Sequence, residues 1–147
     1  MRKTAVLTFI LLCISTPFSN AQEKFSVSGE VVYSGIEKIY VCLHTMETFE
    51  NCLTALPPEK FVEVINGSST GKVIFKIGDV PRGEYVLMVF VDKNGNGKFD
   101  LDTWGNAKEP ISMHKQFEVH GLATMRTNWD RQKFKVDKDV TGIEIKF

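Results

Sequence analysis

The chain has 147 residues, which is enough for one domain with a modest hydrophobic core. Charged residues make up 24% of the sequence and the formal net charge is zero. Nucleic-acid-binding proteins usually carry a basic excess, so this composition argues against that class. We find no repeat or low-complexity tract, and we therefore expect a single domain over residues 22–147.

The first 21 residues have the pattern of a secretory signal peptide. Two basic residues precede an apolar stretch over residues 5–14, which is too short to span a bilayer. Cleavage after Ala21 would yield a secreted or periplasmic protein without a membrane span. The alternatives are an uncleaved anchor and lipidation at Cys13, although Leu12 precedes Cys13 where a lipobox has a small residue.

The mature chain contains two cysteines, Cys42 and Cys52. In an oxidising compartment an even pair of cysteines commonly forms a bridge, so a structural disulfide between them is predicted. The closed loop is short, and chain entropy alone would then contribute about 2–3 kcal/mol to stability. Two buried thiols or a reactive pair are the alternatives, although no C-x-x-C spacing supports redox catalysis.

Alternation of apolar and polar residues predicts short strands along most of the mature chain. The expected strands lie at 25–31, 39–44, 61–65, 72–77, 85–91, 133–136 and 143–147, and 115–119 is a weaker candidate. Turn-forming residues separate them, and the segments 45–58 and 121–131 have no helical period and are interpreted as loops. About seven short strands without a convincing helix indicate an all-β fold, an antiparallel β-sandwich.

The run Y-V-L-M-V-F-V at 85–91 is the most apolar of the mature chain and has no polar face. A strand that is apolar on both faces must be covered on both sides. We therefore expect this strand at the centre of the fold. It leads directly into the most informative motif of the sequence.

That motif, D-K-N-G-N-G-K-F-D at 92–100, has the spacing of a calcium-binding loop. Oxygen-bearing side chains recur at every second position, as at positions 1, 3 and 5 of an EF-hand loop, and Gly97 falls at the sharp turn. The expected ligands are Asp92, Asn94, Asn96, the backbone carbonyl of Lys98, and Asp100, the last directly or through a water.

The pattern departs from an EF-hand at its end, because the twelfth position is Thr103 and no helix is expected before the loop. Asp102 or Glu109 would have to supply the closing carboxylate. With few carboxylates, the expected calcium dissociation constant is on the order of 10⁻⁴–10⁻³ M. The alternative interpretation of residues 92–103 is an Asn-Gly turn that binds no metal.

Three segments together resemble a family of secreted bacterial proteins of unknown function. They are V-P-R-G-E-Y at 80–85, the loop at 92–100, and G-N-A-K-E at 105–109. The family reads roughly L-P-x-G-x-Y, an apolar strand, H-D-x-N-x-N-G-K-x-D, then G-x-P-K-E. The resemblance implies an Ig-like or prealbumin-like (transthyretin-like) sandwich. Val91 and Ala107 replace the family's His and Pro, and neither change affects an expected ligand.

Other candidate sites have weaker support. One strand face would carry His114, Gln116, Glu118 and His120, but the two histidines would be roughly 20 Å apart along a strand, too far for one ion. This face is interpreted as solvated. Trp104 and Trp129 could stack on sugars or pack in the core. The basic residues Arg131, Lys133, Lys135 and Lys138 are expected on the solvent side of a strand.

The sequence therefore favours a non-enzymatic module with a structural calcium loop, which presents a surface to a cell-surface protein or a glycan. The calcium would neutralise the loop carboxylates and fix the loop conformation. A metal-dependent hydrolase and an oligomeric transthyretin-like carrier are the alternatives. No catalytic motif such as H-E-x-x-H or G-x-S-x-G occurs in the chain.

Overall fold

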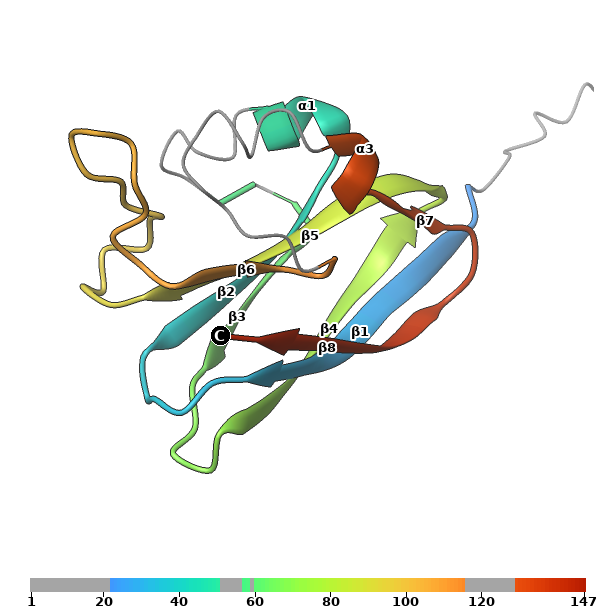
Figure 1. Cartoon of the computed structure of the whole chain (residues 1–147). Coiled ribbons are helices and arrows are strands. Elements are labelled where there is room, and N and C mark those ends of the chain that lie inside the picture. The colour runs from blue at the N-terminus through green and yellow to red at the C-terminus, as the bar shows by residue number, and fades with distance from the viewer. Residues whose placement is uncertain (1–21, 51–56, 59, 116–128) are drawn as a thin grey trace, which may run out of the picture.

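Two β-sheets pack face to face in the computed structural model, which describes residues 22–50, 57–58, 60–115 and 129–147 (Figure 1). The strands are β1 (Lys24–Val32), β2 (Lys38–His44), β3 (Val62–Asn66), β4 (Lys72–Pro81), β5 (Gly83–Asp92), β6 (Ile111–Met113), β7 (Phe134–Val136) and β8 (Val140–Lys146). One sheet has the strand order β4-β1-β8. The other has the order β3-β2-β5-β6, with β7 also paired to β5. The all-β sandwich predicted from the sequence is confirmed.

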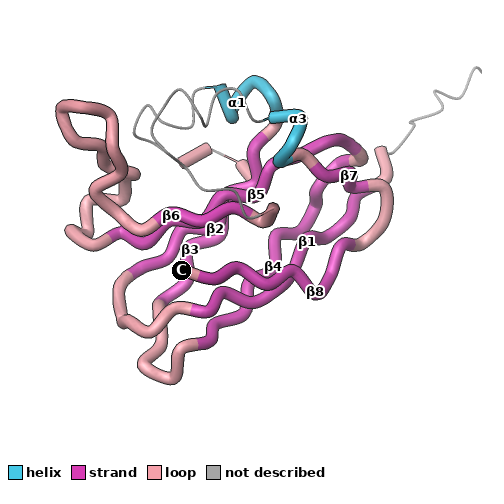
Figure 2. Tube along the Cα trace, in the orientation of Figure 1, coloured by secondary structure: helices cyan, strands magenta, loops and turns pink. Residues whose placement is uncertain are grey.

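Two short helices are present in the described residues, α1 (Met46–Glu50) and α3 (Trp129–Gln132), so the expectation of a helix-free chain is wrong. Figure 2 shows both at the same end of the molecule, next to β5. They pack on the outer face of the five-stranded sheet, where Phe49 of α1 and Trp129 of α3 have ring centroids 5.8 Å apart. A four- or five-residue helix is too short to show a hydrophobic period.

The strand pairs are antiparallel except for β1 and β8, which are parallel. The predicted antiparallel arrangement therefore holds for every other pair of named strands and does not extend to this edge. Parallel pairing is allowed here because no hairpin joins the two strands, which are far apart in the sequence. They approach closely: a Cβ added to Gly29 of β1 would lie 2.1 Å from the carbonyl oxygen of Ile143 in β8.

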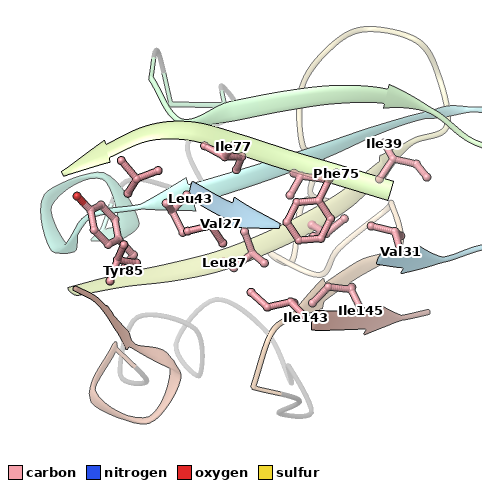
Figure 3. Packing of buried hydrophobic residues seen from close by; sticks show 14 of the residues in the cluster. Val27, Val31, Ile39, Leu43, Phe75, Ile77, Tyr85, Leu87, Ile143 and Ile145 are labelled. Atoms are coloured by element: carbon pink, nitrogen blue, oxygen red, sulfur yellow. The ribbon is translucent and has the colours of Figure 1, made fainter. Parts of the chain in front are cut away.

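Two hydrophobic clusters lie on the two faces of the five-stranded sheet. The main core fills the space between the sheets and includes Val27, Phe75, Leu87 and Ile145 (Figure 3). The second cluster lies on the outer face, below the helices, and includes Phe49, Met88 and Phe90. Alternate residues of β5 enter the two clusters, which confirms that this strand is central and covered on both sides.

The step from β4 into β5 is fixed by Tyr85. Its hydroxyl donates a hydrogen bond to the carbonyl oxygen of Pro81 at 2.9 Å. Its ring lies over Gly83, where an added Cβ would approach the ring to 3.1 Å. This contact is of the tyrosine-corner kind found in β-sandwiches. It explains the P-x-G-x-Y spacing and sets the start of the strand that ends at the candidate site.

Candidate metal centre

The connection between β5 and β6 projects from the edge of the sandwich (Figure 1). Its first part, residues 92–100, is the loop predicted to bind calcium. Its second part, residues 101–107, is a small hairpin closed by a bridge between Leu101 and Ala107. The backbone N–H of Lys108 donates to the carbonyl oxygen of Asp100 at 2.9 Å and joins the two parts.

Asp92 organises the beginning of the loop from the last position of β5, with 3% of its surface exposed. Its Oδ1 accepts the backbone N–H groups of Gly95 at 2.7 Å and Asn96 at 3.2 Å, and its Oδ2 accepts that of Gly97 at 2.8 Å. Gly95 and Gly97 have φ angles of 75° and 73°, in the left-handed region that favours glycine. The N-G-N-G sequence thus lets the backbone wrap around one carboxylate.

The side chains of Asn94, Asn96 and Asp100 converge on one point. The Nδ2 groups of Asn94 and Asn96 donate to Oδ2 of Asp100 at 2.6 Å and 2.7 Å. Their Oδ1 atoms accept the backbone N–H groups of Asn96 and Lys98 at 3.0 Å and 2.8 Å. The bonds from Asn94 and then Asn96 are the main causes of the lowered pKa of Asp100, so this carboxyl stays ionised.

Glu109 closes the loop from its far end. Its Oε1 accepts the backbone N–H of Lys93 at 2.9 Å and its Oε2 that of Asp100 at 3.2 Å, so one side chain holds both ends. Glu109 is 4% exposed. Burial raises its pKa, the two backbone bonds lower it, and the negative charges of Asp92 and Asp100 raise it further. The three carboxylates therefore share one neighbourhood.

Asp102 is the other residue expected to supply a closing carboxylate. Its hydrogen bonds are made within the hairpin at 101–107. Its Oδ1 accepts the backbone N–H groups of Trp104 and Asn106, each at 2.8 Å, and its Oδ2 accepts Nδ2 of Asn106 at 3.0 Å. These bonds, led by those from Asn106, lower the pKa of Asp102. The structure thus brings Asp92, Asn94, Asn96, Asp100 and Glu109 together and places Asp102 in a separate turn. Lys98 is exposed.

No group of three or more His, Cys, Asp or Glu side chains in the described part of the chain is arranged as a metal cluster. The predicted loop would also use the amide oxygens of Asn94 and Asn96 and the carbonyl oxygen of Lys98, which lie outside that set. The metal site therefore stays a prediction.

Two aromatic residues of the site were not singled out from the sequence. Tyr40 of β2 stacks on Phe90, with ring centroids 4.8 Å apart, and its hydroxyl lies 3.1 Å from where a Cβ on Gly97 would stand. Burial raises the pKa of Tyr40, and the charge of Asp92 raises it further. Phe99 is 3% exposed and packs against Phe90, with ring centroids 5.6 Å apart. The only sequence signal for Tyr40 was the β2 alternation.

A cation–carboxylate cluster ties the loop to the β1–β2 connection. Nζ of Lys93 lies 2.6 Å from Oε1 of Glu37 and 5.1 Å from the ring centroid of Tyr33, whose hydroxyl also contacts Lys93 and donates to Oε2 of Glu37 at 3.1 Å. The bond from Lys93 is the largest cause of a Glu37 pKa lowered from 4.5 to about 2. The loop therefore has an electrostatic contact outside its own residues.

We expect Glu37→Gln to reduce stability at neutral pH and to lose this effect as the pH falls through about 2. Because the folded-state pKa of Glu37 is below its unfolded value, its contribution is complete above pH 4.5 and is lost as the pH falls toward 2. The effect should be small and weaken at high salt, since the pair is partly exposed. Thermal unfolding of both proteins across this pH range tests it, and a constant difference would contradict it.

The remaining candidate residues lie apart from this site. Trp104 is 87% exposed, and Trp129 packs on Phe49. Lys133 pairs with Glu84 and Asp130, and Lys135 with Asp137, so this basic stretch has acidic partners. His114 packs edge-on against Phe134. Gln116, Glu118 and His120 lie outside the described residues. Cys42 is buried in β2 and Cys52 lies outside the described residues, so the disulfide remains a prediction.

Comparison with known proteins places the chain in a family and leaves its activity open. Among the described residues, no helix is both long and apolar enough to cross a bilayer. No curated protein and no solved structure matches the chain, so the Ig-like or prealbumin-like subtype remains a prediction. One family model matches residues 22–144. On that match, the chain belongs to a family of uncharacterized proteins conserved in bacteria (DUF2141).

Proposed function

We propose that this protein is an exported bacterial β-sandwich module whose loop at 92–109 binds one calcium ion as a structural element. The signal-peptide pattern of the first 21 residues supports export. The family match supports it as well, because it begins at residue 22, directly after the expected cleavage site. In this proposal calcium fixes the projecting loop and the protein acts through a surface.

The observation that carries the proposal is the grouping of Asp92, Asp100 and Glu109 at one loop, where, among the described residues, only Asp100 feels nearby lysine charges, from Lys108 and Lys98. Asp92 and Glu109 are 3% and 4% exposed. Within the described ranges, none of the three forms an ion pair with a lysine, arginine or histidine. Buried charges are costly unless they are paired or bind a metal, and a divalent cation would offset this repulsion.

The donor types fit calcium, which prefers six to eight oxygen ligands and tolerates irregular geometry. Carboxylates come from Asp92 and Asp100, and amide oxygens from Asn94 and Asn96. Rotation of the two amides about their terminal torsions would turn their oxygens toward the point where their nitrogens now meet Asp100. It would also release the bonds that these oxygens accept from the backbone N–H groups of Asn96 and Lys98, so the ion would have to replace them. Lys98 would add its carbonyl. Glu109 is the closing carboxylate that this geometry favours over Asp102, because it contacts both ends of the loop.

The test is thermal unfolding of residues 22–147 against added calcium, with magnesium and EDTA as controls. Binding to the folded state alone adds about 2.7 kcal/mol at a calcium concentration 100 times the dissociation constant, so Tm should rise. The rise should disappear in Asp92→Asn combined with Asp100→Asn, and decrease in Glu109→Gln. Asp102→Asn is the matched control and should keep it. An unchanged Tm at millimolar calcium would reduce the loop to a hydrogen-bonded turn.

A further inference from the structure

We propose that the hairpin at 101–107 docks the calcium-loaded protein on an anionic lipid surface, with Trp104 as the side chain that enters the interface. This inference rests on the proposed calcium site and adds a partner to it. It is drawn from the exposure and support of Trp104 and from the charge of the connection that carries it.

Trp104 is held at the tip of a projecting turn and is not packed against the sandwich. It is 87% exposed, more than the other large hydrophobic residues of the described chain. Its backbone N–H donates to Oδ1 of Asp102 at 2.8 Å, and Gly105, with a φ of 82°, donates to the carbonyl oxygen of Asp102 at 3.1 Å. The hairpin is therefore ordered by backbone contacts while the indole is left in solvent. Figures 1 and 2 show the backbone of the hairpin extending away from both sheets.

The charge of this connection changes sign when one calcium ion binds. Residues 92–109 contain four acidic residues, Asp92, Asp100, Asp102 and Glu109, and three lysines, Lys93, Lys98 and Lys108, for a formal charge of −1. A bound divalent cation makes it +1. Lys93 pairs with Glu37. Lys98 and Lys108 are exposed, and their positive charges act on Asp100. A calcium ion on Asp92 and Asp100 would take over the neutralisation of these carboxylates, so the connection that carries the indole would then have a surplus of exposed lysine charge.

A lipid surface fits these features better than a glycan. Sugar recognition needs polar groups beside the stacking ring, and those beside Trp104 are already used, because both oxygens of Asp102 bond to its own turn. An indole at a bilayer interface needs only an apolar ring with a polar edge, and nearby lysines gain from anionic headgroups.

The experiment uses the mature protein with Trp129→Phe, so that Trp104 is the single tryptophan, and vesicles of phosphatidylcholine with or without phosphatidylglycerol. With calcium, the Trp104 emission should shift to the blue and the protein should sediment with anionic vesicles only. Both changes should be absent when EDTA is added and when magnesium replaces calcium.

The variants test the residues. Trp104→Ala, measured by sedimentation, should weaken binding to anionic vesicles by at least about ten-fold. Lys98→Gln and Lys108→Gln should each weaken it by about five-fold. Ile74→Ala, at a residue 79% exposed on β4, is the matched control and should bind normally.

Two failures are separable. If calcium raises Tm without vesicles but Trp104 emission does not respond to anionic vesicles, the docking inference is wrong and the calcium proposal stands. If calcium leaves Tm unchanged, both are overturned. Equal binding of Trp104→Ala, equal binding to neutral vesicles, or an emission change with soluble oligosaccharides would each overturn the lipid assignment.

Discussion

Replacing Phe99 by alanine should lower the free energy of unfolding by about 3–5 kcal/mol, the usual cost of removing a buried aromatic side chain. Phe99 is 3% exposed although it belongs to the projecting connection, and it packs 5.6 Å from Phe90 in the outer cluster. This contact attaches the candidate metal loop to the central strand β5. Its removal should therefore also weaken calcium binding, because the loop would have to be ordered by the ion alone.

Urea unfolding of the two proteins measures the first effect, and the calcium dependence of Tm measures the second. Trp104→Ala is the internal control, since it removes an aromatic residue from the same connection at an exposed position and should change stability by no more than about 0.5 kcal/mol. Comparable small losses for both substitutions would show that Phe99 does not anchor the loop.

Replacing Gly29 by alanine should have a similarly large effect, about 3 kcal/mol or more, through steric conflict. The added Cβ would lie 2.1 Å from the carbonyl oxygen and 2.8 Å from the carbonyl carbon of Ile143. Both atoms are backbone, so no rotamer change can relieve the contact, and β8 has to move away from β1. Loss of this edge would expose the main core, in which Ile143 and Ile145 are buried.

Gly78→Ala is the matched control for this substitution. Gly78 is also a strand glycine, in β4, but a Cβ there would meet nothing within 4 Å. Its replacement should change stability by less than about 1 kcal/mol and in the favourable direction, because alanine loses less conformational entropy on folding. Equal unfolding midpoints for the two variants would mean that β1 and β8 are not held as closely as the structure shows.

The long strands were predictable from the sequence. The alternation at 25–31 and 72–77 lies within β1 and β4, where a one-residue shift would expose the whole buried face. The apolar run at 85–91 lies within β5, which is buried on both faces and so has no polar alternation. The three-residue strand β6 and the two short helices were missed, since elements of three to five residues contain too few positions for a period.

The backbone conformation of residues 92–100 was more predictable than the contacts around it, because it depends on residues close together in the sequence. Backbone wrapping around Asp92 depends on residues within five positions and on two glycines, which the motif itself contains. The choice between Asp102 and Glu109 was not accessible, because it depends on how the hairpin returns the chain beside Lys93. Tyr40 reaches the loop only through the β2–β5 pairing, a contact between distant segments.

The parallel edge between β1 and β8 also has a kinetic consequence. Ser26 donates its backbone N–H to Asp139, 113 residues later, and the adjoining ladder pairs Val27 with Val140. Contacts of such long sequence separation form slowly, because closing the intervening chain costs entropy before any contact is gained. The β1–β4 pairing can form earlier, but the β1–β8 ladder has to wait until the last strand is synthesised. In the export proposed above, the smaller sheet would therefore still lack one edge while the chain passes through a membrane channel.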